Sequence, residues 1–201
     1  DSLEDFFIGS AKGFSSNLFI QSSNGRFNKI QHPFILEKGS EDTDCIISDF
    51  NNDGNNDIYV ASGGNEFTEF STQLFDRLYF GDGKGGFNKS EQLFPIGVPF
   101  QSTKGVSYND FDNDGDTDLF ATNYGYSKLF SNRGDGTFIN VTSNTPGLGD
   151  EKYRSTGCAW ADYDSDGYVD LAISRHIYED DPEILSTGDI FTPLGRLHLF
   201  H

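Results

Sequence analysis

The sequence of 201 residues has no methionine, one tryptophan, two cysteines and only 14 lysine and arginine residues. Its 32 aspartate and glutamate residues give a formal net charge of −18, which argues against binding to nucleic acid or to an anionic membrane surface. No segment approaches the ~20 apolar residues of a membrane-spanning helix, and no helical period or coiled-coil heptad appears. The two cysteines, Cys45 and Cys158, each precede a similar acidic motif by four residues. We expect them to lie two structural repeats apart, too far for a disulfide, as buried free thiols.

The carboxylates, by contrast, are abundant and ordered. Residues 110–118 read Asp-Phe-Asp-Asn-Asp-Gly-Asp-Thr-Asp, with side-chain oxygens at positions 1, 3, 5 and 9 and a glycine at position 6. Oxygen ligands at alternate positions, a sharp glycine turn and a backbone carbonyl at position 7 are typical of a calcium loop. The alternative is a solvated acidic turn, in which the like charges would repel one another.

The motif recurs at residues 49–57 and 162–170, and residues 1–5 fit its second half with Ser2 in place of glycine. The position-9 aspartates lie 52, 61 and 52 residues apart, and a solvated turn has no reason to recur in this way. The sequence therefore predicts three complete Ca²⁺ sites and a half-site at Asp1 and Asp5. The expected ligands, with position 7 contributing a carbonyl, are Asp49, Asn51, Asp53, Asn55, Asp57, Asp110, Asp112, Asp114, Asp116, Asp118, Asp162, Asp164, Asp166, Tyr168 and Asp170.

The surroundings of the loops are strands rather than the helices of an EF-hand. Position 12, where an EF-hand has glutamate, is Val60, Ala121 or Ile173. Short apolar runs precede each loop (residues 45–48, 106–108 and 158–160) and follow it (58–60, 119–121 and 171–173). Each loop is followed by a second hairpin with a glycine-rich turn. Four antiparallel strands per repeat predict an all-β fold, a segment of a β-propeller.

The repeats divide the single segment at residues 1–40, 41–100, 101–150 and 151–201, and the first and last repeats are incomplete. The first begins at the second strand of its blade, and the last stops at the third. We therefore expect an open arc of blades, whose partners include the rest of its own propeller.

Loop and hairpin motifs alternating in this order resemble the FG-GAP/VCBS repeat family, which includes the integrin α-subunit propellers. Residues 157–170 are similar to the cartilage acidic protein (ASPIC/UnbV) branch. The resemblance implies calcium-stabilised blades in a secreted, cell-surface or periplasmic protein. The leading expectation is a module that recognises protein or carbohydrate, without catalytic residues. A structural spacer and the propeller part of a glycan-cleaving enzyme, a polysaccharide lyase or hydrolase, remain alternatives.

Three further motifs have structural as well as functional interpretations. Residues 133–135 spell Arg-Gly-Asp but occupy the glycine turn of their repeat. Asn88 and Asn140 begin glycosylation acceptor sequences on the expected outer strands. Residues 175–195 form a long connection that we expect on the face opposite the calcium loops, where it is either a recognition loop or a solvated acidic insertion.

Overall fold

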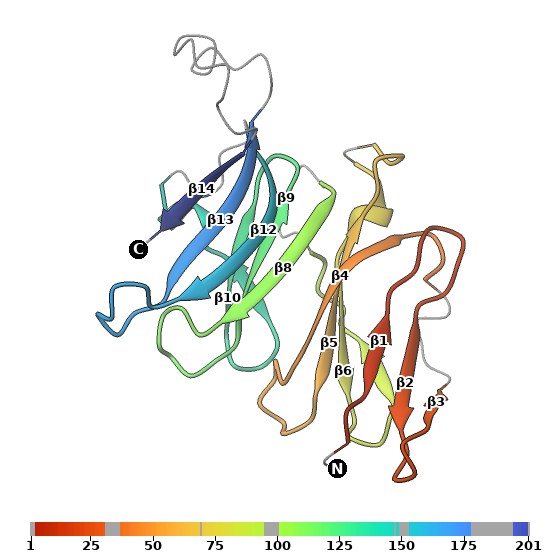
Figure 1. Ribbon diagram of the computed structural model, residues 1–201. Helices are drawn as coiled ribbons and strands as arrows, with labels where there is room; N and C mark the ends of the chain where they lie inside the picture. The colour runs from red at the N-terminus through yellow and green to blue at the C-terminus, as the bar shows by residue number, and fades with distance from the viewer. Residues whose placement is uncertain are drawn as a thin grey trace.

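The computed structural model describes residues 3–30, 37–68, 70–94, 101–146, 148, 153–177 and 195–200. Within these ranges the protein is all-β, with two 3-10 turns and four antiparallel sheets that follow one another along the chain (Figure 1). Each sheet is one blade-like repeat, so the predicted fold class and strand order are confirmed.

The strands of each sheet are consecutive in sequence. The first sheet contains β1 (Phe6–Ile8), β2 (Asn17–Gln21) and β3 (Phe27–Lys29). The second contains β4 (Glu41–Ser48), β5 (Asp57–Gly63), β6 (Arg77–Gly81) and β7 (Phe87–Lys89), with η2 (Thr72–Leu74) before β6. The third contains β8 (Thr103–Asn109), β9 (Asp118–Asn123), β10 (Lys128–Asn132) and β11 (Phe138–Asn140), followed by η3 (Thr142–Asn144). The fourth contains β12 (Tyr153–Ala161), β13 (Asp170–Ile177) and β14 (Gly195–Phe200).

The core lies between neighbouring sheets. Every residue of β5 and β9 is buried, because both faces of a blade pack against other blades or their connections. Phe94, from the connection between the second and third sheets, makes edge contacts with Tyr59 of the second sheet and with Phe130 and Phe138 of the third. This shared aromatic cluster fixes the two sheets relative to each other.

The first strand of each complete loop hairpin begins earlier than the apolar runs predicted. Strand β4 starts at Glu41 rather than Cys45, because its polar residues have partners within the protein. The buried carboxylate of Asp42 pairs with the guanidinium of Arg77, and Asp44 accepts a 3.0 Å hydrogen bond from the backbone N–H of Val106 in the next sheet. The Asp42–Arg77 pair thus holds two strands of the second sheet together, and Asp44 connects this sheet to the third.

The sheets form an arc in Figure 1, with β1–β3 at one side and β12–β14 at the other. The inner strands β4, β8 and β12 contact one another in succession, and the first and last sheets have three described strands each, as expected. No helix among the described residues is long and apolar enough to cross a membrane.

Candidate metal centre

Each predicted calcium loop joins the first two strands of a hairpin: β4 to β5, β8 to β9 and β12 to β13. Position 4 of the loop is left-handed in all three, with φ of 58° at Asn52, 59° at Asn113 and 63° at Ser165. The glycine at position 6 is also left-handed, with φ between 86° and 95°. Two left-handed residues within three positions wrap the chain tightly, and asparagine and glycine adopt this conformation most easily. The sequence motif had indicated only the glycine.

The carboxylate at position 1 organises the turn from within. Asp110 accepts hydrogen bonds of 3.0 Å from the N–H groups of Asp114 and Gly115, at positions 5 and 6. Asp49 and Asp162 bind the same two N–H groups of their own loops, at 2.8–3.2 Å. The N–H of position 7 donates to the position-5 carboxylate in each loop, at 2.8 Å, 2.9 Å and 2.9 Å. The three loops thus share one backbone path.

The carboxylate at position 9 is the buried anchor of each loop: Asp57, Asp118 and Asp170 are at most 1% exposed. Asp118 accepts a 3.0 Å hydrogen bond from the N–H of Phe111, and Asp57 and Asp170 accept the equivalent bond. Its other oxygen accepts the N–H of Asn132, at the end of β10, at 2.8 Å. The end of the third strand therefore helps to hold the loop, a contribution that the motif did not reveal.

The half-motif at the start of the chain has an equivalent hydrogen bond, although its carboxylate is exposed. Asp5 accepts a 2.8 Å hydrogen bond from the N–H of Gln21, the last residue of β2, just as Asp57 binds the N–H of Gly81 at 2.9 Å. This contact places Asp5 at position 9 of its repeat. Asp1 and Ser2 lie outside the described residues.

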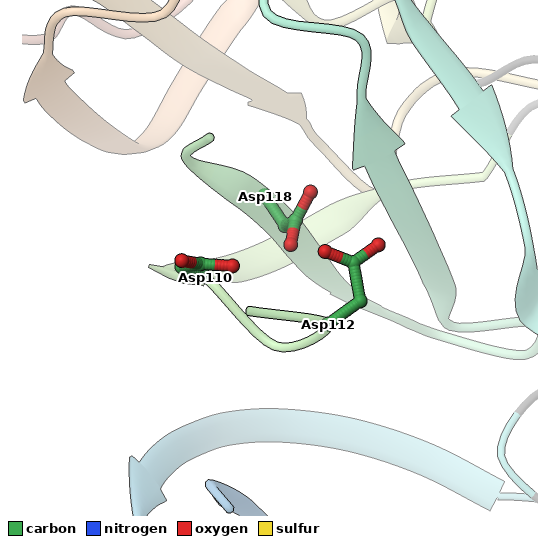
Figure 2. A group of neighbouring side chains, drawn as sticks. All are labelled: Asp110, Asp112 and Asp118. Carbon is green, nitrogen blue, oxygen red and sulfur yellow. The ribbon is translucent and has the colours of Figure 1, made fainter. Parts of the chain in front are cut away.

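The side chains converge in two of the loops. Asp110, Asp112 and Asp118 bring carboxylate oxygens within 4.8 Å of one another, with Asp118 at the start of β9 and Asp112 on the loop (Figure 2). Asp162, Asp164 and Asp166 form a second such group. The fourth predicted carboxylate of each set, Asp114 or Asp170, is outside these groups, which are the two found among the described residues.

The loop at residues 49–57 differs because an amide stands at position 3. Asn51 uses its Oδ1 to accept the N–H of Asp53 at 3.1 Å and its Nδ2 to donate to the Asp53 carboxylate at 3.2 Å. The uncharged amide thus avoids the additional repulsion that a fourth carboxylate in this loop would cause.

The electrostatics of the second loop favour a cation. Burial and, to a smaller extent, the charges of Asp112 and Asp114 raise the pKa of Asp118 to about 7, despite hydrogen bonds from Asn132 and Phe111. Burial also raises the pKa of Asp57. A divalent cation among these oxygens would compensate the charge, and an all-oxygen, carboxylate-rich donor set suits the hard ion Ca²⁺. The residues present therefore fit calcium.

The other candidate residues take structural positions. In the Arg-Gly-Asp tripeptide, Asp135 accepts hydrogen bonds from both the N–H (2.9 Å) and the hydroxyl (2.6 Å) of Thr137 within the turn. Cys45 and Cys158 are free thiols, as expected, but they are half-buried rather than buried, and the hydroxyl of Ser107 lies 3.0 Å from the Cys158 sulfur. Trp160 is partly buried and packs against the core, stacked on Phe111 with ring centroids 6.4 Å apart.

The two glycosylation acceptors lie on outer strands, β7 and β11, at the sheet edges. Asn88 is exposed, whereas Asn140 is half-buried, and its amide oxygen accepts the N–H (3.0 Å) and hydroxyl (2.6 Å) of Thr142 in its own acceptor sequence. Most of the 175–195 connection, residues 178–194, lies outside the described residues.

The repeats of this chain resemble those of known proteins. Residues 110–173, from the second calcium loop to β13, match the model of the FG-GAP-like repeat. This stretch is therefore similar to an FG-GAP-like repeat. The chain is also similar to cartilage acidic protein 1 of Xenopus tropicalis, at 38% identity over 69 residues, which are 34% of this chain and 10% of that protein. The match thus spans about a tenth of that relative's length. The resemblance predicted from the sequence is confirmed, and FG-GAP repeats assemble into propeller-like modules.

Proposed function

We propose that the chain is a calcium-binding propeller segment of an extracellular, cell-surface or periplasmic protein, which recognises a protein or carbohydrate ligand. The observation that carries the proposal is the shared backbone path of the loops at residues 49–57, 110–118 and 162–170, each ending on a buried aspartate. A bound Ca²⁺ supplies the positive charge that the converging carboxylates require. The protein holds the carboxylate oxygens of each loop close together, so that they do not spread apart into water.

Calcium binding is tested by calorimetry and thermal unfolding of the whole chain. We expect the chain to take up three Ca²⁺. Its melting temperature should fall in EDTA, because Ca²⁺ at 100 times the dissociation constant of a site stabilises the folded state by about 2.7 kcal/mol. Asp114→Ala, in the second loop, should lower the melting temperature more than Asp135→Ala, which changes only an exposed turn residue. Absence of calcium uptake by the folded protein would reject the proposal.

The sites should also differ in affinity. The loop at residues 49–57 has an amide at position 3, where the loop at 110–118 has the carboxylate of Asp112. Because affinity depends partly on ligand charge, the first loop should bind Ca²⁺ more weakly than the second, and Asn51→Asp should strengthen it. A site-resolved titration that gives the reverse order would contradict this ranking.

For recognition, we propose the face opposite the calcium loops, where connections vary most in length on a rigid scaffold. Tyr124, just after β9, is partly exposed and lies beneath two cations: Lys104 Nζ is 4.5 Å and the Arg154 guanidinium carbon 5.2 Å from its ring centroid. Cations and an aromatic ring from adjacent sheets can contact the hydroxyls, carboxylates or apolar faces of a ligand. The proposed activity is binding, without a chemical reaction.

A glycan array and affinity capture of secreted proteins identify the ligand class, and a polysaccharide degradation assay tests for an enzyme. Tyr124→Ala should weaken binding at least about tenfold if the ring lies in the contact, as interface aromatics commonly do. Ile139→Ala, a partly exposed residue on the outer strand β11, is the matched control and should leave binding unchanged. If neither the glycan array nor the affinity capture yields a ligand, the recognition proposal fails and the spacer alternative is favoured.

A further inference from the structure

Asn132, the last residue of β10, connects two calcium loops that belong to different sheets. Its side chain is 3% exposed, and Nδ2 donates to the carbonyl of Phe50 at 2.8 Å and to the carbonyl of Thr117 at 3.0 Å. Phe50 directly follows the first ligand of loop 49–57, and Thr117 directly precedes the last ligand of loop 110–118. The backbone N–H of Asn132 also binds Asp118. One buried amide thus holds the main chain beside two sets of ligands.

The amide oxygen of Asn132 completes this arrangement. It accepts the N–H groups of Arg133 and Gly134 at 2.8 Å and 3.2 Å, which fixes the glycine turn after β10. All hydrogen-bonding atoms of the side chain are therefore engaged, so it is held in a single orientation. A rigid amide transmits a displacement of one loop to the other.

A second link joins the same two loops from the other direction. Asn52, the left-handed residue at position 4 of the first loop, donates from Nδ2 to the Asp116 carboxylate at 2.7 Å and to the Gly134 carbonyl at 3.2 Å. Asp116 is position 7 of the second loop, where the main-chain carbonyl is the expected ligand. The side chains of Asn52 and Asn132 thus join the two loops at separate points, although these residues are far apart in sequence.

The equivalent position at the end of the third strand in the second sheet is Gly81. Its N–H binds Asp57, as the N–H of Asn132 binds Asp118, but glycine has no side chain to reach a neighbouring loop. A Cβ at this position would lie 2.2 Å from the Asn56 carbonyl oxygen, so the site does not admit a side chain. Among the described residues, the second sheet therefore has no counterpart of the Asn132 link at this position.

We propose that Asn132 and Asn52 couple the loops at residues 49–57 and 110–118, so that Ca²⁺ bound in one raises the affinity of the other. The proposal rests on the proposed calcium function and concerns how its sites communicate. An ion that orders one loop fixes the shared amides, and the second loop then loses less conformational freedom when it binds. Binding coupling is reciprocal and typically amounts to about 5–150-fold in affinity.

The test requires a separate signal for Ca²⁺ binding at each loop, measured in the whole chain. The position-6 glycines Gly54, Gly115 and Gly167 each donate an N–H to the first carboxylate of their loop, so their amide resonances follow Ca²⁺ loading of each loop. Asp112→Ala removes a ligand of the second loop. We expect it to weaken loading at Gly54 by about fivefold or more and to change loading at Gly167 by less than about twofold.

The linking residues are then removed singly. Asn132→Gly reproduces the residue found at position 81, and Asn52→Gly removes the amide while retaining the left-handed backbone. In a protein that carries Asn132→Gly or Asn52→Gly, adding Asp112→Ala should change Ca²⁺ loading at Gly54 much less than it does in the native protein. Should Asn132→Gly fail to fold, Asn52→Gly alone decides.

The outcomes separate the coupling from the function on which it rests. If all three loops bind Ca²⁺ but Asp112→Ala leaves Gly54 loading unchanged, the loops are not coupled and calcium binding stands. If the effect of Asp112→Ala on Gly54 loading persists undiminished in Asn52→Gly, the amide links do not carry the coupling, and the proposal is likewise wrong while calcium binding stands. If none of the glycine resonances responds to Ca²⁺, the proposed function itself fails.

Discussion

The buried carboxylate of Asp76 makes the stability of this protein depend on pH in a calculable way. It accepts hydrogen bonds from the N–H of Ser62 (2.6 Å), the hydroxyl of Tyr59 (2.8 Å) and the hydroxyl of Thr103 in the next sheet (3.0 Å). These bonds and the charge of Arg77 lower its pKa, but burial outweighs them and raises the pKa from 3.8 to about 6. A difference of about 2 units corresponds to roughly 3 kcal/mol.

The sign follows from proton binding. The folded state holds the proton of Asp76 more tightly than the unfolded state does. Its stabilising contribution is therefore complete below about pH 4 and is lost as the pH rises through about 6. Asp76→Asn removes the titration, so the variant should gain up to about 3 kcal/mol relative to the native protein between pH 4 and pH 7. Rearranged hydrogen bonds in the variant add an offset that does not change with pH.

Urea unfolding at several pH values, with the same calcium concentration for both proteins, measures this difference. Subtracting one curve from the other cancels the titration of the calcium loops, which both proteins share. Asp82→Asn removes an exposed carboxylate whose pKa is lowered by hydrogen bonds from its own turn, and it should not reproduce the gain. Parallel stability curves for the native protein and Asp76→Asn would refute the reasoning.

Two substitutions test the contacts between sheets. Phe94→Ala should lower the free energy of unfolding in urea by about 3–5 kcal/mol, because the Phe94 ring is fully buried among three other rings. Leu93 is 59% exposed, so Leu93→Ala should lower it far less. Equal losses in the two variants would contradict the shared core. Arg77→Met should cost about 3–5 kcal/mol because it leaves Asp42 buried without its cation. Lys89→Ala breaks an exposed pair and should cost at most about 1 kcal/mol, so a larger loss for this control would count against the distinction.

Much of the fold was predictable because the loop motif fixes the order of the strands around it. Once residues 110–118 are placed at a hairpin turn, the flanking apolar runs become the paired strands β8 and β9. The polar start of β4 could not be predicted in the same way, since Asp42 pairs with Arg77 on another strand of its own sheet and Asp44 accepts a hydrogen bond from Val106 in the next sheet. A sequence pattern does not distinguish such a carboxylate from one that faces water.

The positions of the loop carboxylates were predictable from spacing, but the hydrogen bonds that support the loops were not. Asn132 looks like an ordinary turn residue before a glycine, and its partner Phe50 is 82 residues away. Asn52 looks like a spacer between two ligands, yet it bonds to Asp116 in the neighbouring loop. Both contacts exist only because two repeats lie side by side, which no local pattern specifies.

The hydrogen bond from Asn132 back to Phe50 also has a consequence for biosynthesis. The two residues are 82 positions apart, so at 5–20 residues per second the ribosome adds Asn132 on the order of 4–16 s after Phe50. During that interval the sheet β4–β7 can pair its own strands, but the apolar surface of Tyr59 and Leu78 still awaits Phe130 and Phe138. While the third sheet is being translated, this apolar surface is therefore open to aggregation and to binding by a chaperone.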